Sequence, residues 1–146
     1  MPNTAFSGFT AISASPWAYP VLEALHVLGI ALLVGNLVLL ELRVWGRGAA
    51  VSAPQLARLA LPVALAGFAL VLFSGLLMFS AAPLQLLANR VFVWKMGLLA
   101  LVGCNAVFFH TRGGLVKLDA VARAQALLSV VLWCSIIACG RWIAYV

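Results

Sequence analysis

The sequence contains very few charged side chains, and acidic ones are the rarest. Only 8% of its 146 residues are charged, with nine Lys and Arg against three Asp and Glu. An average soluble domain has about 25% charged residues, which it needs to cover its surface. The hydrophobic content of 66% and the mean hydropathy of +1.17 point the same way. The composition therefore excludes a soluble globular protein and predicts a chain embedded in a lipid bilayer.

Cysteine is also scarce, and its spacing matches no common cross-link or metal motif. Cys104, Cys134 and Cys139 all lie in apolar runs, and they form neither a CxxC pair nor a Cys/His zinc pattern. An odd number of cysteines without such spacing argues against a disulfide framework. We expect the three side chains to be small, buried and free. Basic residues are not interleaved with aromatic ones either, so the net charge of +6 does not indicate nucleic-acid binding.

Long apolar runs are what the sequence does have. They cover residues 17–42, 56–80, 91–110 and 122–146, and short polar or turn-like pieces separate them. Each run reaches about the 20 residues that a helix needs to cross a bilayer. Short connections make successive helices antiparallel. We therefore predict an all-α protein with one domain over residues 1–146, folded as an integral-membrane, up-down four-helix bundle.

The distribution of basic residues predicts how this bundle is oriented. Six of the nine border the first and third loops: Arg43, Arg47, Arg58, Arg112, Lys117 and Arg123. Lys and Arg are enriched on the cytoplasmic side of membrane proteins, so both termini are expected outside the cytoplasm. The first sixteen residues lack the basic start of a signal peptide, and we expect them to form a short outer tail.

Polar residues inside the spans are the candidate functional groups, because burying them in a membrane is unfavourable. At about 1.5 Å per residue, His26 and Lys95 both lie roughly 6 Å inside the outer boundary. The antiparallel helices bring Ser74, Met78 and Arg141 to the same outer layer, and Glu23 is one turn above His26. His110, in contrast, ends the third run, roughly 22 Å from the height of His26. A single metal ion or haem iron cannot bridge that separation.

His26 is a candidate axial haem ligand, since a neutral imidazole binds iron well. The alternative is a buried histidine that bonds to Glu23 or to another helix. In the ligand interpretation, Glu23 orients the imidazole through its second ring nitrogen. Lys95 and Arg141 are candidate partners of haem propionates or of an anionic substrate, and the alternative for both is that they extend to the membrane surface.

The inner end of the bundle carries a second set of polar residues. His110 is a candidate ligand whose partner is open, and the alternative is a charge cluster with Glu41 and Arg43. Asn36 and Asn105 lie in mid-span, where an interhelical hydrogen bond is expected. Glycines of the spans are expected to permit close helix packing: Gly29, Gly35, Gly67, Gly75, Gly97 and Gly103.

The stretches "HVLGIALLVGNLVLLELR" and "NRVFVWKMGLLALVGCNAVFFH" resemble small bacterial four-helix membrane proteins. These include the copper-resistance D domain and the membrane protoporphyrinogen oxidases. The resemblance implies that His26 and Lys95 are the functional pair, and that haem b, a porphyrin or periplasmic copper is handled near the outer face. The chain lacks a Met-rich or His-rich tract, which argues against copper. His110 is fifteen residues from Lys95, which argues against the oxidase.

The sequence therefore favours a haem b protein of the bacterial inner membrane that transfers electrons. His26 and His110 are the candidate iron ligands, and Lys95 and Arg141 complete the candidate haem site. The alternative is a non-redox protein, either an ion or copper transporter or an accessory structural subunit of a membrane complex. Whether the protein is an enzyme that oxidises a porphyrin stays open. Expected partners are the lipid bilayer, a redox protein or a larger complex, and a second copy of the chain.

Overall fold

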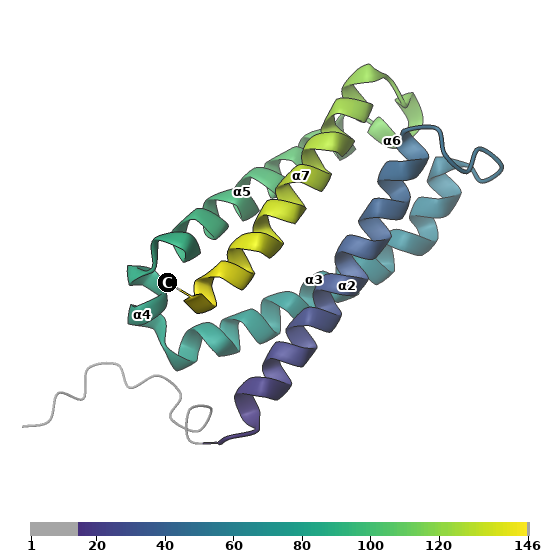
Figure 1. Ribbon diagram of the computed structural model, residues 1–146. Coiled ribbons are helices and arrows are strands. Elements are labelled where there is room, and N and C mark those ends of the chain that lie inside the picture. Colours follow the sequence, from purple (N-terminus) through teal and green to yellow (C-terminus); the bar gives the residue numbers. More distant parts are fainter. Residues whose placement is uncertain (1–14, 146) are drawn as a thin grey trace, which may run out of the picture.

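The computed structural model describes residues 15–145, and all regular structure in this range is helical (Figure 1). Four helices are long: α2 (Ala18–Val44), α3 (Ala53–Ala81), α5 (Arg90–Thr111) and α7 (Ala120–Trp142). Two are short, α4 (Pro83–Ala88) and α6 (Gly114–Lys117), and a 3₁₀ turn at Ile143–Tyr145 follows α7. The predicted all-α class is confirmed. Most of the expected outer tail, and Val146 at the end of the fourth predicted run, lie outside the described residues.

Polar caps explain why three of the long helices begin before the apolar runs. The Ser52 hydroxyl accepts a hydrogen bond from the backbone N–H of Gln55 at the start of α3. Asn89 Oδ1 accepts from the N–H of Val91, 2.9 Å away, at the start of α5. Asp119 likewise caps α7. A side-chain oxygen at this position satisfies an N–H group that has no partner inside the helix. The apolar pattern starts only after the cap, so it predicts the boundary a few residues late.

The long helices form two antiparallel hairpins (Figure 1). Helix α2 packs along α3, and α5 packs along α7. Helices α2 and α7 make the main contact between the hairpins, and this contact is shorter. The chain thus runs up and down four times, as the short connections predicted.

Helices α2 and α3 approach until their backbones touch. A Cβ atom added at Gly67 would lie 2.7 Å from the carbonyl oxygen of Gly29 and 2.7 Å from the backbone nitrogen of Leu33. Only glycine fits such a crossing, so close packing is confirmed at this pair. The same expectation is wrong for Gly35, Gly97 and Gly103, which have no other atoms within 4 Å of the Cβ position.

The buried core is small, because most apolar side chains point away from the helix interfaces. Three buried clusters hold the helices together; they centre on Leu40 with Ala57, on Val44 with Ala122, and on Val102 with Leu132. Large apolar side chains are exposed along all four long helices. These helices are long and apolar enough to cross a membrane.

The three cysteines are free, as expected, but their burial was predicted wrongly. Cys104 and Cys134 are exposed, and Cys139 is half-buried. Cys104 and Cys134 thus lie on exposed faces of α5 and α7. An apolar run shows that a segment is hydrophobic, but it does not show which side of the helix faces a neighbour.

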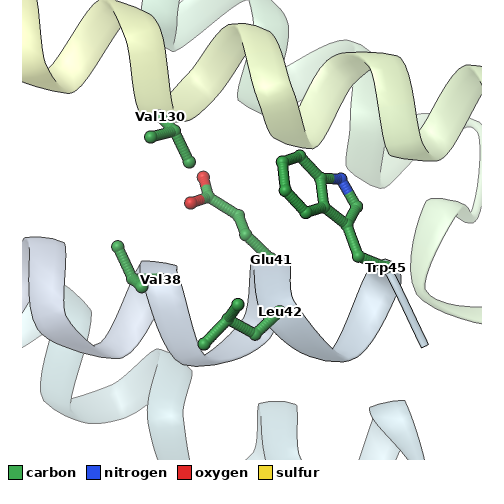
Figure 2. A pocket seen from close by; sticks show the side chains of 5 residues that line it. All are labelled: Val38, Glu41, Leu42, Trp45 and Val130. Carbon is green, nitrogen blue, oxygen red and sulfur yellow. The ribbon is translucent and has the colours of Figure 1, made fainter. Parts of the chain in front are cut away.

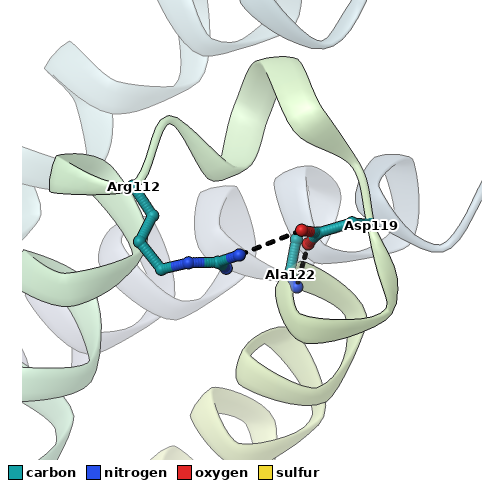
Figure 3. Close-up of polar contacts among 3 residues, drawn as sticks. All are labelled: Arg112, Asp119 and Ala122. Carbon is teal, nitrogen blue, oxygen red and sulfur yellow. Dashed lines mark hydrogen bonds and ion pairs between the residues drawn. The ribbon is translucent and has the colours of Figure 1, made fainter.

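Polar contacts close the end of the bundle where the first and third loops lie. Arg112 Nη2 donates to Asp119 Oδ2 at 2.9 Å, and the other carboxylate oxygen of Asp119 caps α7 by accepting from Ala122 N–H (Figure 3). The indole N–H of Trp45, just after α2, donates to the carbonyl of Arg123 at 3.1 Å. The two loops are therefore tied to the start of α7.

Candidate functional site

His26 is held by a hydrogen bond between the two helices of the first hairpin. Its ring nitrogen Nδ1 lies 2.9 Å from the hydroxyl oxygen of Ser74 on α3. Ser74 is completely buried, while His26 is half-buried. The Ser74 hydroxyl also lies 2.6 Å from the carbonyl oxygen of Leu70, one turn earlier in α3, and donates to it. The imidazole is thus the first group of a short hydrogen-bond chain.

This chain favours the tautomer of His26 in which Nδ1 carries the proton. A serine hydroxyl has one hydrogen to donate, and Ser74 gives it to the Leu70 carbonyl. Ser74 must therefore accept from Nδ1–H of His26. A neutral imidazole has one protonated nitrogen, so Nε2 carries a free lone pair. This nitrogen can bind a metal ion or accept a proton.

The sequence left two partners open for His26, Glu23 or a group on another helix, and the structure shows the second. Glu23 is exposed, and the ring bonds to Ser74 instead. The reason is that α3 passes so close to α2 that Ser74 reaches the ring, whereas Glu23 sits near the free start of α2. The neighbouring Gly75 leaves room for the imidazole, because a Cβ there would lie 3.3 Å from His26 Cε1.

Lys95 comes from the second hairpin and lies near His26. Its ammonium group packs against α7, where Nζ is 3.5 Å from the position that a Cβ of Gly140 would occupy. Lys95 lies within range of an electrostatic interaction with His26, and the Cys139 side chain is also nearby. The structure therefore places His26 and Lys95 in the same part of the bundle, on different hairpins.

Arg141 is also at this end of the bundle, but it is exposed and bonded elsewhere. Its Nη2 donates to the Tyr145 hydroxyl at 3.1 Å, and its guanidinium lies 5.5 Å from the centre of the Tyr145 ring. Within residues 15–145, these are the polar contacts of its side chain. Arg141 can meet a ligand at the rim of the site, whereas Lys95 lies deeper.

His110 is separate from His26. It is exposed in the last turn of α5, where its ring meets that of Phe109 edge-on with 5.6 Å between centres. The end of α5 and the start of α2 lie at opposite ends of the bundle (Figure 1). Among the described residues, no three His, Cys, Asp or Glu side chains gather to hold a metal ion. The geometry supports His26 and His110 only as members of different sites.

The expected charge cluster of Glu41, Arg43 and His110 is not formed. Figure 2 shows the Glu41 carboxylate pointing from α2 across to Val130 of α7. Arg43 instead donates from Nε to the carbonyl oxygen of Val51, 2.6 Å away. Residues two positions apart on a helix face different directions, which separates Glu41 from Arg43.

The two mid-span asparagines differ. Asn105 Nδ2 donates to the backbone oxygen of Gln125 on α7 at 3.0 Å, so its predicted interhelical bond is confirmed. Asn36 bonds to Leu32 O in its own helix, at 2.7 Å, so the same prediction was wrong there. The sequence analysis missed Gln125 as a polar core residue: its side chain is 7% exposed, and neither amide atom has a partner.

Comparison with known proteins connects the chain to one family. Residues 7–146 match a family of unknown function, DUF6644. The match does not extend to the copper-resistance D or protoporphyrinogen oxidase families. No curated protein and no solved structure matches the chain. Because the match covers nearly its whole length, the chain belongs to the DUF6644 family.

Proposed function

We propose that this protein crosses the bacterial inner membrane four times, binds haem b through His26 and transfers electrons. The observation that supports this proposal is the hydrogen-bond chain from His26 to Ser74 and Leu70, which leaves Nε2 with its lone pair. Histidines that bind metals in proteins usually donate the other ring N–H to an oxygen in this way, which holds the ring in the required tautomer. Within the described spans, His26 is the histidine with such support.

The residues around His26 offer groups that would hold a haem. Haem bound here would supply an iron that cycles between two oxidation states. Ser74, completely buried, holds the imidazole in one orientation. Lys95, on the other hairpin, would supply a positive charge for a propionate, and Arg141 would supply a second one nearer the surface. An ion pair of this kind is stronger in a medium of low dielectric constant than in water.

The visible spectrum of the protein purified in detergent tests the proposal. We expect a Soret band that shifts on reduction with dithionite, and pyridine haemochrome analysis should identify haem b. His26→Ala should lose most of the bound haem, because it removes the ligand atom. His110→Ala is the matched control and should retain it, since His110 lies at the other end of the bundle. A colourless wild-type protein from haem-supplemented cells would refute the proposal.

Replacing Ser74 tests how the ring is held. Ser74→Ala should weaken haem binding by about 10–100-fold, the usual effect of removing a partner of a ligating histidine. Ser135→Ala is the matched control, because the Ser135 hydroxyl bonds only to Val131 O of its own helix. Haem titration of both apoproteins measures the difference. Equal affinities would contradict a positioning role for Ser74.

The proposed orientation places both termini outside the cytoplasm, since the first and third loops carry most of the basic residues. The exposed aromatic rings of Trp17, Trp94, Trp142 and Tyr145 support it, because they gather at the opposite end, where an outer interface would be. A reporter enzyme that is active only in the periplasm should be active when fused after Val146. Activity of a reporter that works only in the cytoplasm would reverse this orientation.

The second candidate is an accessory structural subunit of a larger membrane complex. Helix α5 favours it, because Val102 is its only buried residue and the rest of its surface can take a neighbour. This candidate predicts a colourless protein that is purified together with other membrane subunits.

A further inference from the structure

A second polar site lies at the loop end of the bundle, away from His26. The Glu41 carboxylate occupies the interface of α2 and α7, beside a cavity of about 30 Å³. Apart from Glu41, apolar or aromatic side chains line this cavity: Val38, Leu42, Trp45 and Val130. Figure 2 shows the carboxylate pointing between the two helices, with the Trp45 ring on the side of the helix end. The carboxylate therefore borders a cavity whose other lining side chains are apolar or aromatic.

Among residues 15–145, no positive charge forms an ion pair with this carboxylate. Arg43 on α2 bonds to the Val51 carbonyl, while Arg123 on α7 and Arg58 on α3 are exposed. Within the described chain, the one ion pair joins Arg112 to Asp119. An unpaired carboxylate in an apolar setting is far less favourable than the neutral acid. The surroundings of Glu41 therefore suit a carboxyl group that holds a proton.

Helix α7 presents polar groups to the same region. The Ser129 side chain lies beside the Glu41 carboxyl group. Gln125 is one turn before Ser129, and residues four apart lie on the same face of a helix. Gln125 is buried with its Nε2 and Oε1 atoms both unpartnered. Buried amide atoms without a protein partner are rare, so these two atoms suit a bound water or another polar group.

We propose that Glu41 is a proton-binding site between α2 and α7 that exchanges its proton with the side of the membrane on which the first and third loops lie. The step adds one proton from water to a carboxylate oxygen and involves no electron transfer. Ser129 holds the carboxyl group at the α7 surface, and Gln125 offers the next polar atoms along that face. The site is independent of haem binding at His26, so it can be tested in protein with or without haem.

Dicyclohexylcarbodiimide, an apolar reagent that modifies protonated carboxylic acids, tests the proposal. The chain has only three acidic residues, so peptide mass spectrometry can follow all of them: Glu23, Glu41 and Asp119. At neutral pH in detergent or vesicles, we expect labelling of Glu41 and little labelling of the other two. Labelling of Glu41 should decline as the pH is raised. Glu41→Gln should abolish the label, and Glu23→Gln, the matched control, should leave it unchanged.

Infrared spectroscopy provides a second measurement that does not depend on access of the reagent. The wild type should show a carboxylic acid C=O band at neutral pH that disappears at alkaline pH, and Glu41→Gln should lack it. Circular dichroism should show unchanged helix content, because Gln has nearly the shape of Glu. The proposal would be overturned if Glu41 were labelled at acidic but not at neutral pH. It would also be overturned if the wild type and Glu41→Gln had identical infrared bands.

Discussion

Replacing Gly67 by alanine should destabilise the protein, although the same change elsewhere in a helix stabilises it. A Cβ at Gly67 would lie 2.7 Å from Gly29 O and from the Leu33 nitrogen, and both are backbone atoms that no rotamer change can move. Ordinary Cβ contacts begin at 3.4 Å, so α2 and α3 must separate by about 0.7 Å (3.4 minus 2.7). Overpacking of this kind costs about 1–3 kcal/mol.

The opposing term is the helix propensity, which favours Ala over Gly by about 1 kcal/mol. Gly67→Ala should therefore lower the free energy of unfolding by up to about 2 kcal/mol. A separation of 0.7 Å at Ser74 would also lengthen its bond to His26 from 2.9 Å to about 3.6 Å, beyond hydrogen-bonding range. The substitution thus affects both stability and the candidate site.

Gly35→Ala is the matched control, because Gly35 is in the same helix as Gly29 but has open space at its Cβ position. It should raise the free energy of unfolding by up to about 1 kcal/mol. Thermal unfolding in detergent, followed by circular dichroism, measures both variants. The reasoning is refuted if Gly67→Ala unfolds at or above the temperature of the wild type, or if both variants shift in the same direction.

Three further predictions concern Lys95, Asp119 and Trp45. Lys95→Met should lower the midpoint potential of bound haem, because it leaves a propionate unpaired. Lys95→Arg should restore part of the lost potential. Identical potentiometric titrations of Lys95→Met and the wild type would exclude this role. The hydrogen bond from the Ala122 N–H, and then Arg112, hold the pKa of Asp119 below its ordinary value. The ionised carboxylate therefore stabilises the fold fully above the unfolded pKa of about 3.9. This stabilisation is lost as the pH falls through the lower pKa of the folded state. Melting temperatures should therefore fall on acidification less in Asp119→Asn than in the wild type, and parallel pH profiles would contradict this. Trp45→Phe removes the indole donor to the Arg123 carbonyl and should lower the free energy of unfolding by about 1 kcal/mol, whereas an unchanged denaturation midpoint would show that this bond contributes nothing.

The number, type and order of the long helices could be predicted from the sequence, because long apolar runs and short connections leave few arrangements. The position of each residue along the bundle axis was also predictable. Counting residues from the span boundary placed Ser74 in the same layer as His26, and the two side chains do meet. Helical rise depends only on the number of residues, so it needs no knowledge of the packing.

The rotation of each helix about its own axis could not be predicted. The hydrophobic pattern is nearly uniform around α2 and α5, so it does not show which face meets a neighbour. This is why the sequence could not decide between Glu23 and another helix for the partner of His26, and why Asn36 was expected to reach another helix. The face of a helix that is buried is determined by close contacts such as Gly29 with Gly67, and a glycine in an apolar run gives no sign of whether it makes one.

The backbone contact at Gly29 and Gly67 also determines which parts of the protein can move relative to one another. Two helices packed so closely behave as a single stiff body, whereas the shorter interface between α2 and α7 permits sliding of one hairpin past the other. His26 belongs to the first body and Lys95 to the second. A shear motion of the hairpins would therefore change the separation of these two residues while the interior of each hairpin stays intact.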